Sequence, residues 1–180
     1  IQPVLDQIDD IDSVIDLTSV LGNAWISGVT SPINSGLGFN RIDPNAYQMS
    51  VGAGGLGLPD RSYYLTDTER FNDILTAYKE NIAKTLSFIG VEDAEKKAEQ
   101  IIALETKIAE AQWPREKRRN RDLTLNQISR ADLLNEYTGF DWDTYFASSG
   151  YKVPDLNITQ PEPVKEMIKL VNMNLSKVTL

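Results

Sequence analysis

The sequence contains neither cysteine nor histidine. Without cysteine, disulfide bonds and thiolate chemistry are excluded, although the cellular compartment stays open. Without histidine, the chain lacks the commonest general base and the usual ligand of a catalytic zinc ion. A zinc-peptidase helix of the His-Glu-x-x-His type therefore cannot lie within these 180 residues. Because the carboxylates that remain prefer hard cations, we expect no metal-binding residue and no tight zinc binding in this chain.

Long apolar runs and positive charge are also scarce. No run of about 20 apolar residues occurs, so the sequence predicts no membrane-spanning segment. The 18 lysine and arginine residues are outnumbered by 26 acidic residues, which gives a net charge of −8. This balance argues against a nucleic-acid partner and against an anionic membrane surface. An apolar content of 41% is sufficient for a hydrophobic core, so we expect one folded domain or a piece of a larger one.

Glycine is concentrated in one stretch, Val51–Leu65, with the sequence VGAGGLGLPDRSYYL. Four of its glycines fall within six residues, and a proline and two tyrosines follow them. Glycine clusters of this density occur where the backbone needs a positive φ or passes close to another segment. We therefore predict a positive φ at one or more of Gly54, Gly55 and Gly57. We also predict that this stretch is the crossing point between two parts of the chain.

The same glycines match the G-x-G-x-x-G pattern of dinucleotide-binding folds, at Gly52, Gly54 and Gly57. Such a site also needs a preceding strand, a helix that opens on the third glycine, and an acidic residue about 20 positions later, after a second strand. Here the turn residues Leu58-Pro59-Asp60-Arg61 follow, and the region about 20 positions on has helical periodicity. The pattern therefore favours a structural turn over a nucleotide site.

Apolar periodicity predicts a mainly α-helical fold. A spacing of three and four residues predicts helices over Asp9–Trp25, Thr66–Ile89 and Glu92–Trp113. Thr66 is expected to cap the second of these helices. Only Gly90 and Val91 separate the second helix from the third, so we expect the two long helices to form an antiparallel hairpin.

Little β structure is predicted. Between Gly36 and Val51, apolar and polar residues alternate on both sides of the turn sequence Asp43-Pro44-Asn45. This alternation predicts one small β-hairpin, which should lie against helices because an isolated hairpin is marginal in water. Tyr151–Ile158 is a candidate for a further extended strand.

Three shorter helices are predicted in the second half of the chain. Ser129 begins a sequence that resembles a capping box, and Asp141 is a suitable N-cap for the next helix. Pro161 and Pro163 open a last helix. Its expected buried face consists of Val164, Met167, Ile168 and Val171.

One basic segment, Trp113–Asp122, lies within this acidic chain. Its cationic residues are Arg115, Lys117, Arg118, Arg119 and Arg121. One interpretation is a solvated loop whose charges pair with carboxylates elsewhere. The other is a patch that faces an acidic substrate or another part of the same molecule. The first is the commoner case.

No residue pattern indicates a catalytic site. Glu105 and Glu110 are five positions apart and do not share a helix face. The serines have no histidine partner. Asp60 and Arg61 could form a buried ion pair, but their place in a tight turn indicates a structural role. We expect this chain alone to be inactive, with no catalytic, cofactor-binding or metal-binding residue.

The segment Gly54–Tyr64, GGLGLPDRSYY, closely resembles a signature in the non-catalytic part of the neprilysin-like zinc endopeptidases, which include bacterial oligoendopeptidase O. The family form has Asp-Tyr-Tyr where this chain has Ser-Tyr-Tyr. A second match is Gly139–Trp142, GFDW. The basic segment is a weaker match, with Leu125 in place of a tyrosine and Asn120 in place of an aspartate. The signature residues are Gly54, Gly55, Gly57, Pro59, Asp60, Arg61, Tyr63 and Tyr64.

The resemblance implies that residues 1–180 are a piece of the helical amino-terminal domain of a larger peptidase. In that family this domain closes over the zinc domain, so that only peptides enter the enclosed cavity. The implied partners are the missing catalytic domain of the same polypeptide and its peptide substrates, and zinc is implied only for the parent protein. The alternative is a free-standing helical protein-interaction module. A His-Glu-x-x-His motif downstream in the parent reading frame would select the peptidase.

Overall fold

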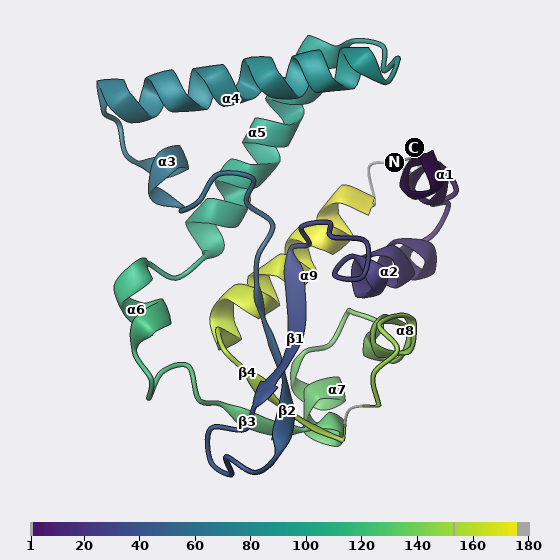
Figure 1. Ribbon diagram of the computed structural model, residues 1–180, viewed down its shortest axis with the longest axis vertical. Helices are drawn as coiled ribbons and strands as arrows, with labels where there is room; N and C mark the ends of the chain where they lie inside the picture. Colours follow the sequence, from purple (N-terminus) through teal and green to yellow (C-terminus); the bar gives the residue numbers. More distant parts are fainter. Residues whose placement is uncertain (1, 153, 176–180) are drawn as a thin grey trace. The chain divides into compact units, whose positions relative to one another are not determined.

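The computed structural model describes residues 2–152 and 154–175 (Figure 1). The chain divides into two compact units. Unit 1 contains the described residues up to Gly55 and those from Trp113 onward, whereas unit 2 extends from Leu56 to Gln112. The boundary between Gly55 and Leu56 lies inside the glycine-rich stretch, which confirms its prediction as a crossing point.

Unit 2 is built from three helices. Two of them are long and form the predicted pair, in which the chain reverses direction between them; Figure 1 shows that they cross at an angle and diverge away from the turn that joins them. The helices are α3 (Ser62–Leu65), α4 (Glu69–Phe88) and α5 (Ala94–Ala111). On α5 the small residues Ala94 and Ala98 are buried, so the two helices approach closely. Gly90, with a φ of 79°, ends α4 and turns the chain back, as its position predicted.

The predicted cap of the first long helix is wrong by two residues. Thr68 caps α4, because its side-chain oxygen accepts a hydrogen bond from the backbone N–H of Phe71 at 3.4 Å. Thr66 instead terminates α3, where its N–H donates to the carbonyl of Ser62 at 3.0 Å. The extra turn of helix before α4 gives no periodic signal, since it has only four residues.

Unit 1 contains a mixed sheet with the strand order β1-β2-β4-β3 among the residues that the structure describes. Its strands are β1 (Ile33–Phe39), β2 (Tyr47–Ala53), β3 (Gln127–Ser129) and β4 (Asp155–Ile158). The antiparallel pair β1–β2 confirms the predicted hairpin, and β4 lies within the predicted extended segment. The hairpin is therefore not a sheet by itself, because β2 pairs in parallel with β4 and β4 pairs with β3. The three residues of β3 are too few to show alternation.

Six described helices complete unit 1. They are α1 (Gln2–Asp9), α2 (Val14–Asn23), α6 (Arg115–Arg119), α7 (Arg130–Glu136), α8 (Trp142–Ser148) and α9 (Pro161–Leu175). Two predicted caps are confirmed, because Ser129 accepts from the N–H of Asp132 and Asp141 accepts from that of Thr144. One interpretation of the basic segment was a solvated loop, but its first part forms α6. No helix in the described part of the chain has the length and apolar character of a membrane span.

The helix predicted over Asp9–Trp25 is confirmed but is shorter than expected, because α2 spans Val14–Asn23 and the preceding α1 was not predicted. The structure has two helices, α1 and α2, and the side chain of Ser13 caps the second by accepting from the N–H of Asp16 at 3.1 Å. The apolar stripe is also misplaced, since Ile15 is 59% exposed. The face of α2 that is buried consists of the small residues Thr18 and Gly22, which a search for large apolar side chains overlooks.

The largest buried side chains of unit 1 lie on α8. The side chains of Trp142, Tyr145 and Phe146 are each about fully buried, at 1% exposure. The indole N–H of Trp142 donates to the carbonyl of Tyr137 at 2.9 Å, so no polar atom of this ring is left unpaired. Helix α9 packs against β2, and its predicted stripe of Val164, Met167, Ile168 and Val171 is buried. The hydroxyl of Tyr145 donates to the carbonyl of Ile33 at 3.0 Å, which joins α8 to β1 of the sheet.

Candidate functional site

The first two signature glycines belong to unit 1. Gly55 has a φ of 87°, which confirms the prediction of a positive φ in this run. The N–H of Gly54 donates to the carbonyl of Pro32 at 2.8 Å, extending the pairing of β1 and β2. A Cβ atom at Gly54 would lie 2.7 Å from the carbonyl oxygen of Ser31. Gly55 is therefore required by its conformation, and Gly54 by a close approach.

The later signature residues fold onto the helices of unit 2. The carboxylate of Asp60 accepts from the N–H of Ser62 at 3.0 Å, at the start of α3. The guanidinium of Arg61 donates through Nε to the carbonyl of Ala109 at 2.9 Å, near the end of α5. The structure thus gives each residue of the suspected ion pair a backbone partner. The ring of Tyr63 lies 4.9 Å from that of Phe71, and Pro59 is exposed at the turn.

Three side chains from different helices meet in what we call the tyrosine–carboxylate cluster, namely Tyr64, Tyr78 and Glu105. The hydroxyl of Tyr64 donates to one carboxylate oxygen of Glu105 at 2.5 Å, and that of Tyr78 donates to the other at 3.1 Å. The Tyr64 hydroxyl also accepts from the N–H of Leu58 at 2.9 Å. A Cβ at Gly57 would lie only 1.8 Å from the Tyr78 hydroxyl oxygen. The glycine therefore leaves room for this hydroxyl.

The cluster is suited to holding helices together rather than to acid–base chemistry. Burial, together with the negative charge of Glu105 and its hydrogen bond, raises the pKa of Tyr78 to about 12. Burial and the hydrogen bond to Glu105 raise the pKa of Tyr64 further. Both phenols therefore stay protonated near neutral pH, and both carboxylate oxygens are occupied. The partners of Glu105 lie 41 and 27 positions away in the sequence, so its spacing from Glu110 gave no signal for this cluster.

These pKa shifts predict a loss of stability at alkaline pH. A raised pKa means that the folded state keeps protons that the unfolded chain loses near pH 10. The stabilisation is therefore fully present below about pH 10 and decreases as the pH rises toward about 12. We expect Tyr78→Phe to reduce this alkaline decrease in melting temperature. The exposed Tyr47→Phe serves as the control, and an equal effect of both substitutions would contradict the assignment.

The close approach at Gly57 predicts a second effect on unit 2. Gly57→Ala should displace the Tyr78 ring, because the added methyl group and the hydroxyl oxygen would otherwise be 1.8 Å apart. The hydrogen bond from Tyr78 to Glu105 is then lost. We expect a decrease of about 1–2 kcal/mol in the free energy of unfolding, measured by denaturant titration. The control is to introduce Gly57→Ala into a Tyr78→Phe background, which lacks the hydroxyl. If Gly57→Ala lowers the free energy of unfolding equally in both backgrounds, the clash with the hydroxyl is not the cause of the loss.

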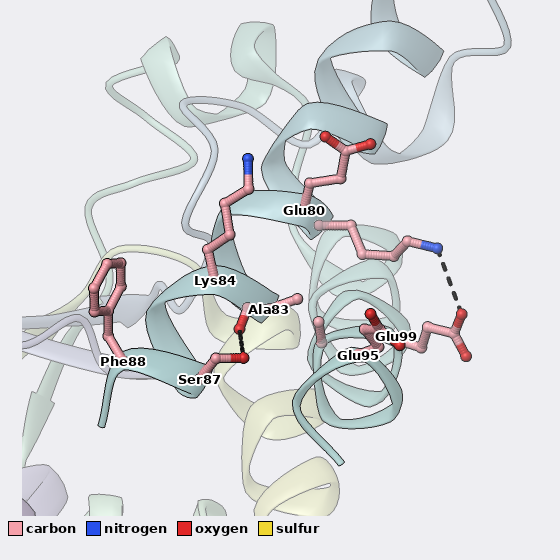
Figure 2. Close-up of a pocket in the computed structure, with 9 residues that line it drawn as sticks. Glu80, Ala83, Lys84, Ser87, Phe88, Glu95 and Glu99 are labelled. Carbon is pink, nitrogen blue, oxygen red and sulfur yellow. Dashed lines mark hydrogen bonds and ion pairs between the residues drawn. The ribbon is translucent and has the colours of Figure 1, made fainter. Parts of the chain in front are cut away.

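A groove of about 720 Å³ lies along α4 and α5, within unit 2 (Figure 2). Its lining combines charged and small residues, and Lys79 bridges to Glu99 at 3.4 Å across the two helices. The hydroxyl of Ser87 donates to the carbonyl of Ala83 at 2.9 Å, so it is engaged by its own helix. Figure 2 shows Phe88 at the end of the groove, pointing away from α5. The groove therefore presents no nucleophile with a neighbouring base.

The donor set of the chain does not suit zinc. Histidine and cysteine are absent from the sequence, and no described group of three or more acidic residues is arranged to hold a metal ion. We therefore predict that calorimetric titration of the purified chain with zinc shows no site of sub-micromolar affinity. A saturable site with one zinc ion per chain at that affinity would contradict this prediction.

Comparison with known proteins gives consistent matches along the chain. The sequence profile described as Peptidase family M13 matches residues 1–180. Human endothelin-converting enzyme 1 is 31% identical over 123 residues, which are 67% of this chain and 16% of that protein. The chain thus spans about a sixth of the curated relatives that it matches.

Solved structures agree with the sequence matches. The zinc metalloprotease Zmp1 of Mycobacterium tuberculosis, in complex with an inhibitor, matches with a TM-score of 0.87 and 30% identity. The match covers 98% of this chain and 28% of that one. PepO from Lactobacillus rhamnosis HN001 shares the fold, with a TM-score of 0.71 and 13% identity over 94% of this chain and 27% of that one.

Proposed function

Because this chain belongs to peptidase family M13, we propose that it forms the non-catalytic helical part of a zinc-dependent metalloendopeptidase. In this proposal it encloses the active-site cavity and restricts substrates to peptides. The observation that carries the proposal is the match to Zmp1, which covers nearly the whole of this chain but 28% of that metalloprotease. The zinc ion and its ligands would lie in the part of the polypeptide outside these 180 residues.

The residues of the chain support an enclosing role rather than a chemical one. In unit 2, the tyrosine–carboxylate cluster joins α3 and α4 to α5, and Arg61 adds a link from the signature turn to Ala109. Such cross-links between helices favour a single rigid arrangement of this unit. A rigid wall limits what enters a cavity by size, and it needs neither a nucleophile nor a general base.

Substrate restriction can be tested on the full-length protein. Residues 56–112 form unit 2, so they are replaced by a short glycine–serine linker between Gly55 and Trp113. We expect the unaltered enzyme to hydrolyse a decapeptide but not a long unfolded polypeptide, whereas the variant hydrolyses both. The zinc content of the variant is the control, because a variant that binds as much zinc as the unaltered enzyme has an intact catalytic part. A zinc-loaded variant with unchanged substrate preference would contradict the proposed restriction.

The isolated chain provides a separate test of whether catalysis resides outside these 180 residues. We expect the 180-residue chain to hydrolyse none of the peptides that the full-length enzyme cleaves, because the chain has no histidine and no zinc ligands. If the parent reading frame carries no His-Glu-x-x-His motif downstream, the free-standing interaction module is the correct function instead.

A further inference from the structure

The basic segment of unit 1 carries several exposed arginines. Arg115, Arg119 and Arg121 are exposed, and none of them forms an ion pair with any residue that the structure describes. The segment itself offers only the carboxylates of Glu116 and Asp122 against five cations. The first interpretation of the sequence, in which these charges pair with carboxylates elsewhere, is therefore wrong for these three arginines.

The fold adds a further cation to this segment. Arg41 comes from the turn between β1 and β2, about 80 positions away in the chain. Its guanidinium donates to the carbonyl of Arg121 at 2.8 Å and to the hydroxyl of Thr124 at 2.9 Å. These bonds use neutral acceptors, so they leave the positive charge of Arg41 uncompensated beside the backbone of Arg121. The carboxylate of the nearby Asp43 accepts from the N–H of Asn45 at 3.0 Å, and Arg41 forms no ion pair with any residue that the structure describes.

The backbone next to these cations is ordered by local hydrogen bonds. The side chain of Asn120 accepts from the N–H of Asp122 at 2.9 Å and from that of Leu123 at 3.3 Å. Thr124 is 8% exposed, and its N–H donates to the carbonyl of Asn120 at 3.1 Å. The ammonium group of Lys117 lies 5.5 Å from the centre of the Trp113 ring. An ordered cationic surface loses less entropy on binding than a mobile loop does.

We propose that Arg41, Arg115, Arg119 and Arg121 form a binding site for an extended acidic peptide segment. Arg115 and Arg119 are four positions apart on α6, so their Cβ atoms are about 5–6 Å apart. Alternate residues of an extended peptide point to the same side and are roughly 6.6–7 Å apart. Acidic residues at every second position of the ligand therefore match this spacing. The inference that the bound peptide is a substrate of the parent enzyme rests on the proposed function. The inference that this chain binds an acidic peptide does not.

The test measures peptide binding by the 180-residue chain, without proteolysis. The probe is a fluorescent decapeptide of alternating serine and glutamate, and its binding is followed by anisotropy. The matched ligand replaces each glutamate by glutamine, and a single-stranded oligonucleotide of equal charge is a third ligand. We expect the glutamate peptide to bind best, with an affinity that falls as salt increases. Equal binding of the glutamine peptide, or tighter binding of the oligonucleotide, would overturn the proposal.

A charge-matched pair of variants locates the site. The variant Arg115→Gln/Arg119→Gln/Arg121→Gln is expected to weaken binding by about tenfold. The control variant carries the same loss of charge on exposed lysines of α5, as Lys96→Gln/Lys97→Gln/Lys107→Gln. It should bind within about twofold of the unaltered chain. If the two variants lose affinity equally, net charge rather than a site explains the binding, and the proposal is wrong.

Discussion

Replacing Trp142 with alanine is expected to lower the free energy of unfolding by about 3–5 kcal/mol. Its side chain is 1% exposed and lies in an aromatic cluster, with the Phe140 ring centre 4.8 Å away and that of Phe146 at 5.8 Å. Alanine leaves a large cavity, because rings held by several neighbours cannot collapse into it. The carbonyl of Tyr137 also loses the indole N–H that donates to it at 2.9 Å.

The measurement is chemical unfolding followed by far-ultraviolet circular dichroism, with Trp25→Ala as the matched control. Trp25 is 48% exposed, and among the described rings it stacks on that of Tyr151 only, so its loss should cost less than about 1.5 kcal/mol. A protein of this size should melt roughly 10 °C lower with Trp142→Ala. Equal effects of the two substitutions would show that the cluster around α8 is not the centre of the core.

Gly22→Ala should also be strongly destabilising, by about 2–3 kcal/mol. A Cβ atom at this position would lie 2.3 Å from the carbonyl oxygen of Tyr145 and 3.1 Å from its Cα. Both atoms belong to the backbone of α8, so no side-chain rotation relieves the overlap and the two helices must separate. In an exposed helix the same change would be favourable by about 1 kcal/mol, because glycine is a poor helix former. The expected sign is therefore the reverse of the helix-propensity rule.

Gly36→Ala is the control, because no atom lies within 4 Å of the Cβ position at Gly36. We expect it to change the free energy of unfolding by less than about 1 kcal/mol in the same assay. A hydrogen-exchange measurement adds a local readout, since loosening of α2 from α8 should increase exchange in both helices. If Gly22→Ala is as stable as the unaltered chain, α2 does not pack against α8 as described.

Several features of the fold were predictable because their causes are local. The helical periodicity of α4, the stop at Gly90 and the capping residues Ser129 and Asp141 all depend on a few neighbouring positions, and the helix, its stop and both caps are confirmed, although no residue of α4 is fully buried. The positive φ within the glycine run is confirmed at Gly55 for the same reason. Errors arose where a short element lacks a period of its own, as for α3 and β3, or where the buried face is made of small residues, as on α2.

The sequence by itself excluded zinc ligation through histidine or cysteine, predicted the helix pair, and carried the signature by which the chain resembles its family. Those properties depend on residue identity and short spacing. Only the tertiary structure decided which residues come into contact. Tyr64 and Tyr78 donate hydrogen bonds to Glu105, and Arg41 donates one to the carbonyl of Arg121. The tertiary structure also decided that Gly22 is a contact point between two helices. Such contacts join positions tens of residues apart, and no local pattern specifies them because burial and close approach are properties of the folded chain.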